Sequence, residues 1–153
     1  MAFFLVQHGT CLPKDLDPER GLSEQGLQEV TTIAAAADSH RIHVKRIYHS
    51  GKKRALQTAE IIATALQPEN GVQSKSGLNP LDDVASFLNV IEKEDHIMLV
   101  GHLPFMEKLT AFLITGNADN SVVRFQNGGI VCLEKDPDRN TWLIKWTLFP
   151  TIE

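Results

Sequence analysis

The sequence has few cysteines and no long apolar run, and both absences exclude classes of protein. Its two cysteines, Cys11 and Cys132, are far apart, so there is neither a disulfide framework nor a zinc knuckle. A reduced, intracellular setting is the simpler interpretation. No stretch approaches the roughly 20 apolar residues of a membrane span. The apolar run at residues 2–6 has no positive flank and no small-residue cleavage site, so it is not a secretory signal. We therefore expect a cytoplasmic protein.

An excess of positive charge is also absent. Lysine and arginine number 15 against 19 aspartates and glutamates, which gives a formal net charge of −4. A chain of this charge lacks the overall field of a protein that coats nucleic acid or anionic lipid, and we expect neither as a partner. Any anion that it binds must be held by a local cluster of donors. The length of 153 residues, 42% of them hydrophobic, predicts a single domain over residues 1–153.

Short apolar runs alternate with amphipathic segments over the first two thirds of the chain. Continuous apolar runs predict buried strands at residues 2–6, 44–48 and 97–100. Helical spacing predicts four helices. The first follows an N-cap at Ser23, the second and third span 53–66 and 84–91, and the fourth extends from Pro104 to Gly116. The last third has strand-like runs at 121–125, 129–134 and 142–148. This order predicts a three-layer α/β/α sandwich whose mostly parallel central sheet has antiparallel edge strands.

Polar residues of related chemistry follow three of the predicted parallel strands. His8 follows the first strand, Ser50 follows the second with Arg54 one helical turn on, and His102 follows a later strand. Parallel strands end at the same edge of a sheet, so these groups are expected to converge there. The helices after Gly51 and His102 would direct their N-termini to the same place. The combination predicts a site for a small dianion, most plausibly a phosphoryl group.

The same residues predict a reaction. A neutral imidazole nitrogen of His8 is a suitable nucleophile for phosphorus, and a covalent phosphohistidine divides one difficult displacement into two easier ones. Arg54 can hold two phosphoryl oxygens in a fork. A protonated His102 would add positive charge opposite the oxygens on which negative charge accumulates. With this many donors, neither a metal nor another cofactor is required.

Four sequence blocks together resemble the histidine phosphatase superfamily, which is phosphoglycerate mutase-like, and within it the short phosphohistidine phosphatases of the SixA type. The blocks are Gln7-His8-Gly9, Leu22-Ser23-x-x-Gly26, Ser50-x-x-x-Arg54-Ala55-x-Gln57-Thr58 and Val100-Gly101-His102-Leu103-Pro104. The resemblance covers nearly the whole chain. It implies that His8 is the nucleophile and that His8, Arg54 and His102 all bind phosphate. We also expect Gln7, Gly9, Ser50 and Leu103 to contact the substrate, although Ser50 has the alternative role of capping the following helix.

Gln7 departs from the family, whose opening triplet is Arg-His-Gly. An amide can still donate a hydrogen bond but cannot make the bidentate cationic contact. A hydrogen bond to a charged group contributes roughly 1.5–3 kcal/mol, so its loss at the transition state would cost about ten- to a hundredfold in rate. Two readings follow: a slowed phosphatase, or a degenerate module that binds phosphate or a phosphoprotein without turnover.

The second departure from the family concerns the general acid. Larger family members use a carboxylate to protonate an alcohol leaving group, and the SixA type generally lacks it. Asp82 and Asp83 lie roughly where such an acid would fall, but a solvated cap for the helix at 84–91 is the favoured interpretation of both. An imidazole leaving group needs less help than an alkoxide. The resemblance therefore implies a phosphohistidine protein of a signalling or phosphotransfer system as substrate, with a general phosphomonoesterase for small molecules as the alternative.

Overall fold

The computed structural model describes residues 1–151 and is built around one six-stranded sheet. In sequence order the strands are β1 (Ala2–Gln7), β2 (Arg46–His49), β3 (Val72–Ser74), β4 (Ile97–Gly101), β5 (Ile130–Asp136) and β6 (Thr141–Leu148). Their order across the sheet is β3-β2-β4-β1-β5-β6. The first four in that order are parallel, β5 runs antiparallel to β1, and β6 runs antiparallel to β5.

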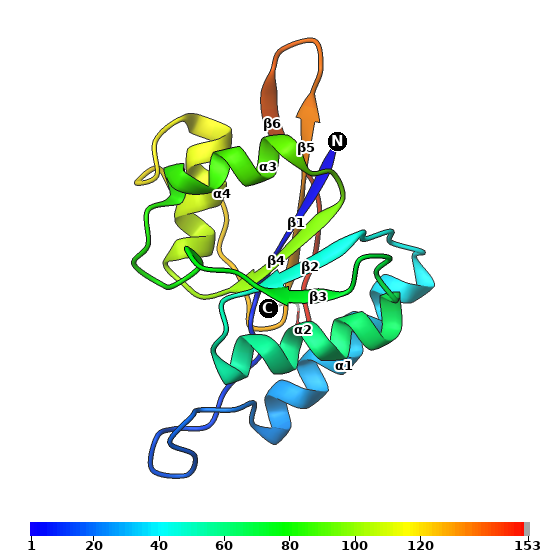
Figure 1. Cartoon of the computed structure of the whole chain (residues 1–153), viewed down its shortest axis with the longest axis vertical. Helices are drawn as coiled ribbons and strands as arrows, with labels where there is room; N and C mark the ends of the chain where they lie inside the picture. Colours follow the sequence, from blue (N-terminus) through cyan, green and yellow to red (C-terminus); the bar gives the residue numbers. More distant parts are fainter. Residues whose placement is uncertain (152–153) are drawn as a thin grey trace.

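Helices cover both faces of the sheet (Figure 1). Two helices, α1 (Glu24–Ser39) and α2 (Lys53–Leu66), pack on one face. The short 3-10 helix η1 (Val84–Phe87), with α3 (Leu88–Lys93) and α4 (Phe105–Thr115), packs on the other. The predicted three-layer α/β/α architecture with antiparallel edge strands is thus confirmed. Within the described residues, no helix is long and apolar enough to cross a bilayer.

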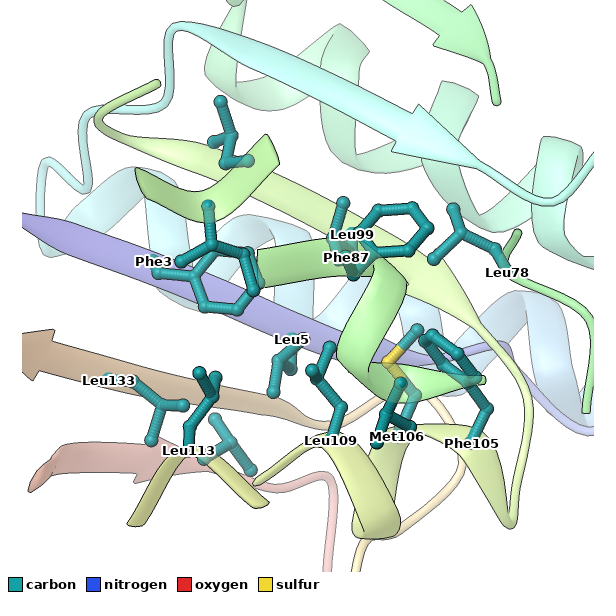
Figure 2. Close-up of a cluster of buried hydrophobic side chains, with 14 of the residues drawn as sticks. Phe3, Leu5, Leu78, Phe87, Leu99, Phe105, Met106, Leu109, Leu113 and Leu133 are labelled. Atoms are coloured by element: carbon teal, nitrogen blue, oxygen red, sulfur yellow. The ribbon is translucent and has the colours of Figure 1, made fainter. Parts of the chain in front are cut away.

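The continuous apolar run of β1 is explained by burial on both of its faces. Phe3 and Leu5 join the cluster beneath α4, whereas Phe4 and Val6 join the cluster beneath α1 and α2. Figure 2 shows the first of these clusters, in which side chains from α4 meet those of the central strands. A strand covered on both sides has no polar face, so its sequence does not alternate.

Helix α1 begins where the sequence predicted. The Ser23 Oγ accepts a hydrogen bond from the Gly26 N–H at 3.1 Å, and so satisfies a donor that the first turn leaves without an intrahelical partner. Helix α2 has the predicted bounds, and α4 ends at Gly116 in the left-handed conformation that glycine adopts without strain.

The segment at 121–125, expected to be a strand, is not one. The place beside β1 is taken by β5, and the segment joins neither edge strand, β3 or β6. The segment instead packs against α4, where the Phe125 N–H reaches the Glu107 carboxylate at 3.4 Å and the Phe125 ring is buried in the core. The short edge strand β3 was not predicted, since its three residues carry no alternating or continuous apolar pattern.

Candidate active site

The order of the strands brings the predicted polar residues together. Strands β2, β4 and β1 are neighbours, and their carboxyl ends carry Ser50, His102 and His8. The His8 and His102 rings lie with centroids 5.0 Å apart, and the Ser50 Oγ lies 2.6 Å from the His102 Nε2. Three residues separated by up to 94 positions therefore share one small volume at the carboxyl edge of the sheet.

The His8 ring has a defined tautomer. Its Nδ1 lies 2.7 Å from the carbonyl oxygen of Gly9, which can only accept, so Nδ1 carries the proton and donates it. The other ring nitrogen, Nε2, is left with its lone pair. Burial, opposed in part by the Gly9 hydrogen bond, lowers the pKa of His8, and the positive charges of Arg54 and Arg20 lower it further. His8 is consequently neutral and nucleophilic at physiological pH.

His102 is also neutral at physiological pH. Burial is the main cause that lowers its pKa to about 3; the charges of Arg54 and Lys52, and of His8 if it takes up a proton, act in the same direction. Its Nδ1 is buried and has no hydrogen-bond partner within residues 1–151. A bound anion would supply that partner and reverse the local charge that disfavours protonation.

Arg54 lies in the first turn of α2, and the neighbouring motif residues fix that helix against the chain that follows β1. The Thr58 hydroxyl donates to the Arg54 carbonyl at 2.8 Å and accepts from the Gly9 N–H at 3.1 Å. The Gln57 Oε1 accepts from the Leu22 N–H at 2.7 Å. Burial, followed by repulsion from Arg20, lowers the pKa of Arg54, although the guanidinium remains charged.

The other predicted contact residues are placed as follows. The Gln7 Oε1 is buried without a partner in the described part of the chain, and the Gln7 carbonyl accepts from Gly128 at 2.8 Å. A Cβ on Gly9 would lie 2.8 Å from Val30 Cγ2, so glycine is required there for α1 to approach. Leu103 packs against the core cluster beneath α4, which gives it a structural role as well.

The carboxylates that were considered as a general acid are engaged locally. The Asp83 Oδ1 accepts from the Ala85 N–H at 3.0 Å and caps η1, and the Asp82 Oδ2 accepts from the Asn79 N–H at 2.8 Å. The Asp83 contact matches the capping alternative, whereas Asp82 bonds the backbone of the preceding turn and does not cap the helix. Between Met1 and Thr151, no three histidine, cysteine or acidic side chains are grouped so as to hold a metal ion.

Arg20 is the charged neighbour of the site that the sequence did not single out. It lies in the loop between β1 and α1, where its Nη2 donates to Cys11 Sγ at 3.5 Å and its Nε to the Leu12 carbonyl at 3.4 Å. Its charge is close enough to lower the pKa of both His8 and Arg54. The only sequence signal was its position two residues before the Leu22-Ser23 block.

Solved structures with this fold act on chemically different phosphates. The protein histidine phosphatase SixA, complexed with tungstate, is 24% identical with a TM-score of 0.83, over 98% of this chain and 97% of that one. A mycobacterial glucosyl-3-phosphoglycerate phosphatase is 14% identical with a TM-score of 0.75, over 95% and 97%. A phosphoserine phosphatase from Entamoeba histolytica is 16% identical with a TM-score of 0.69, over 96% of each chain. At these identities the likeness shows the fold and leaves the substrate open.

A family model gives the closer assignment. No functionally curated protein matches the chain. The model of the histidine phosphatase superfamily (branch 1), however, matches residues 4–83, the half of the chain that contains His8 and Arg54. The chain belongs to the histidine phosphatase superfamily.

Proposed function

We propose that this protein is a phosphatase that acts through a covalent phospho-His8 intermediate on phosphohistidine carried by another protein. The observation that supports it best is the hydrogen bond from His8 Nδ1 to the Gly9 carbonyl, because it leaves Nε2 unprotonated for attack on phosphorus. The lowered pKa of His8 keeps that nitrogen neutral in the pH range of the cell.

The proposed reaction has two displacements. In the first, the Nε2 lone pair forms a bond to phosphorus while the P–N bond of the substrate breaks, and the leaving imidazole keeps the electron pair and takes a proton from water. In the second, water attacks the phosphorus of phospho-His8 as the P–Nε2 bond breaks, Nε2 recovers its lone pair, and the proton lost by the attacking water replaces the one that solvent gave up in the first step, so that inorganic phosphate leaves. Arg54 would hold the phosphoryl oxygens in both steps. The unpartnered Nδ1 of His102 would donate to one of them.

The choice of substrate rests on the leaving group. Asp82 and Asp83 each accept a local backbone hydrogen bond, and we assign neither of them the role of general acid. A P–N bond is the phosphate linkage that depends least on such a donor. The likeness to the tungstate complex of SixA, a protein histidine phosphatase that holds a tetrahedral oxyanion, agrees with this choice.

The test is a panel of three substrates: a protein phosphorylated on histidine, a phosphoserine peptide and an aryl phosphate. Wild type should release phosphate fastest from the phosphohistidine protein, and His8→Ala should lower that rate about a thousandfold or more, because no covalent intermediate can form. His43→Ala, a change of the same residue type at an exposed site, serves as the control and should retain the wild-type rate.

Two results would contradict the proposal. Turnover that survives His8→Ala would exclude the covalent route. Binding of phosphate without release from any substrate would favour a degenerate binding module, the alternative that Gln7 suggests. Intact-protein mass spectrometry at alkaline pH, where phosphohistidine persists, would detect the phosphorylated enzyme directly.

A further inference from the structure

A cavity adjoins the candidate active site and is larger than a phosphoryl group requires. It has a volume of about 600 Å³ and lies between the loop that joins β1 to α1 and the first turn of α2, both visible in Figure 1. Arg54 lines this cavity and also carries the charge that acts on His8 and His102. Its volume falls within the range of sites that hold a small ligand or a side chain.

The walls of this cavity are strongly cationic in a protein whose net charge is −4. Its charged lining residues are five cations and one acid, namely Lys14, Arg20, Lys52, Lys53, Arg54 and Glu19. The Lys53 ammonium is paired with Asp17 at 2.9 Å and approaches Glu19 at 3.8 Å. Within residues 1–151, the other four cations make no ion pair. Positive charge therefore exceeds negative charge beside the site, and Lys53 is the cation that the nearby carboxylates neutralise.

The loop that supplies Lys14 and Arg20 is held in place. The Asp17 carboxylate bonds both Lys53 Nζ and the Gly21 N–H, each at 2.9 Å, so the loop is anchored to α2. Arg20 has a φ of 52° and is tethered through its guanidinium to Cys11 and to the Leu12 carbonyl. Such an arrangement keeps Arg20 beside Arg54, whose charge it repels. An anion placed between them would relieve that repulsion.

We propose that this cavity is a second anion subsite, which takes an acidic side chain next to the phosphorylated residue of a protein substrate. The inference rests on the proposed function, since the phosphoryl group is what positions the acidic neighbour. Lys14 and Lys52 suit a carboxylate because each offers a compact charge on a flexible stem. Pro18 and Leu56, which also line the cavity, would contact the methylene groups of a glutamate or aspartate.

The experiment compares two histidine-phosphorylated peptides that differ only beside the phosphohistidine, where one carries glutamates and the other glutamines. Wild type at low salt should favour the acidic peptide about five- to tenfold in kcat/KM, the sum expected from two or three exposed ion pairs. High salt should reduce this ratio towards one. The double variant K14Q/K52Q should bring the ratio of kcat/KM for the two peptides towards one, and this ratio cancels any effect of Lys52 on His102 that both substrates share. Lys45→Gln, at the opposite edge of the sheet, is the control and should keep the preference.

The subsite and the proposed function fail in different ways. Equal rates for the two peptides in wild type, or a preference that persists in K14Q/K52Q, would overturn the subsite and leave phosphatase activity standing. If neither peptide is hydrolysed, the proposed function fails. The subsite is then tested by a binding experiment, in which fluorescence anisotropy measures the affinity of the His8→Ala protein for each of the two phosphorylated peptides. Tighter binding of the acidic peptide supports it, and equal affinity overturns it.

Discussion

Single protons and single hydrogen bonds decide what the site can do at the scale of residues. The Gly9 carbonyl fixes His8 in one tautomer, whereas the buried Nδ1 of His102 has no hydrogen-bond partner among the residues that the structure describes. Ser50 bonds His102, so its hydroxyl serves the second imidazole as well as the start of α2. Gln7 differs from the other residues expected to bind the phosphoryl group, because its amide side chain brings no positive charge to the anion.

Replacement of Gln7 by arginine should raise kcat/KM towards a phosphohistidine protein about tenfold, because a charged donor adds roughly 1.5 kcal/mol or more at the transition state. The comparison is with Gln7→Met, which has a similar length but no polar group and should be slower than wild type. Steady-state kinetics on the three proteins measure the effect. An arginine variant no faster than the methionine variant would show that charge at this position is irrelevant.

At the scale of helices and strands, close contacts between elements hold the site residues in position. A Cβ on Gly26 would lie 2.0 Å from the Thr10 carbonyl oxygen, and that same oxygen accepts hydrogen bonds from the Ser23 N–H at 2.9 Å and the Ser23 Oγ at 3.1 Å. The first turn of α1 is thus packed directly on the chain that leaves His8. The glycine is needed for this contact even though it weakens the helix itself.

Gly26→Ala should therefore destabilise the protein, although the same change inside an exposed helix stabilises by about 1 kcal/mol. The methyl group cannot be accommodated against backbone, so we expect a loss of about 2 kcal/mol or more in the free energy of unfolding. Urea denaturation measures it. The control is Gln25→Ala, an exposed neighbour on the same helix, which should change stability by less than about 0.5 kcal/mol. A stabilised Gly26→Ala protein would refute the packing argument.

Charge placement is the main feature at the scale of the whole molecule. In a chain of negative net charge, one cavity beside two buried imidazoles is lined by four cations that make no ion pair within residues 1–151, namely Lys14, Arg20, Lys52 and Arg54. Burial, together with neighbouring positive charge, lowers the pKa of both imidazoles below the usual 6.5, so they stay neutral where a free histidine would take up a proton. The folded protein therefore resists proton uptake that the unfolded chain accepts.

Stability should consequently fall as the pH is lowered from 6.5. Above pH 6.5 both states keep His102 neutral, whereas between 6.5 and its folded pKa of about 3 only the unfolded chain binds the proton. The His102 contribution alone amounts to about 2 kcal/mol between pH 6.5 and 5. The lowered pKa of Asp17, about 2, acts only below pH 4 and does not overlap with this window.

Urea denaturation at pH 7.5, 6 and 5 measures this loss, and His102→Asn should show a smaller dependence on pH. His43→Asn, at an exposed position, should retain the wild-type dependence. Equal slopes for wild type and His102→Asn would mean that His102 is not held neutral by the fold. Added phosphate should reduce the loss at pH 5, because the anion stabilises the protonated imidazole.

The sequence by itself determined most of the architecture. The doubly buried strand β1, the Ser23 cap of α1 and the bounds of α2 follow from local patterns of apolar residues and hydrogen-bonding side chains, which report on burial and helix ends directly. His8, Arg54 and His102 could also be selected from the sequence, because parallel strands end at a common edge and the surrounding blocks match a family.

Only the tertiary structure decided the partners of those residues. The segment 121–125 packs against α4 instead of pairing as a strand, and the place of Arg20 near His8 depends on how the loop between β1 and α1 folds back. The tautomer of His8, the bond between Ser50 and His102 and the cationic cavity likewise join residues distant in sequence or arise from backbone geometry. Side-chain patterns record how polar or apolar a position must be, but not which neighbour satisfies it.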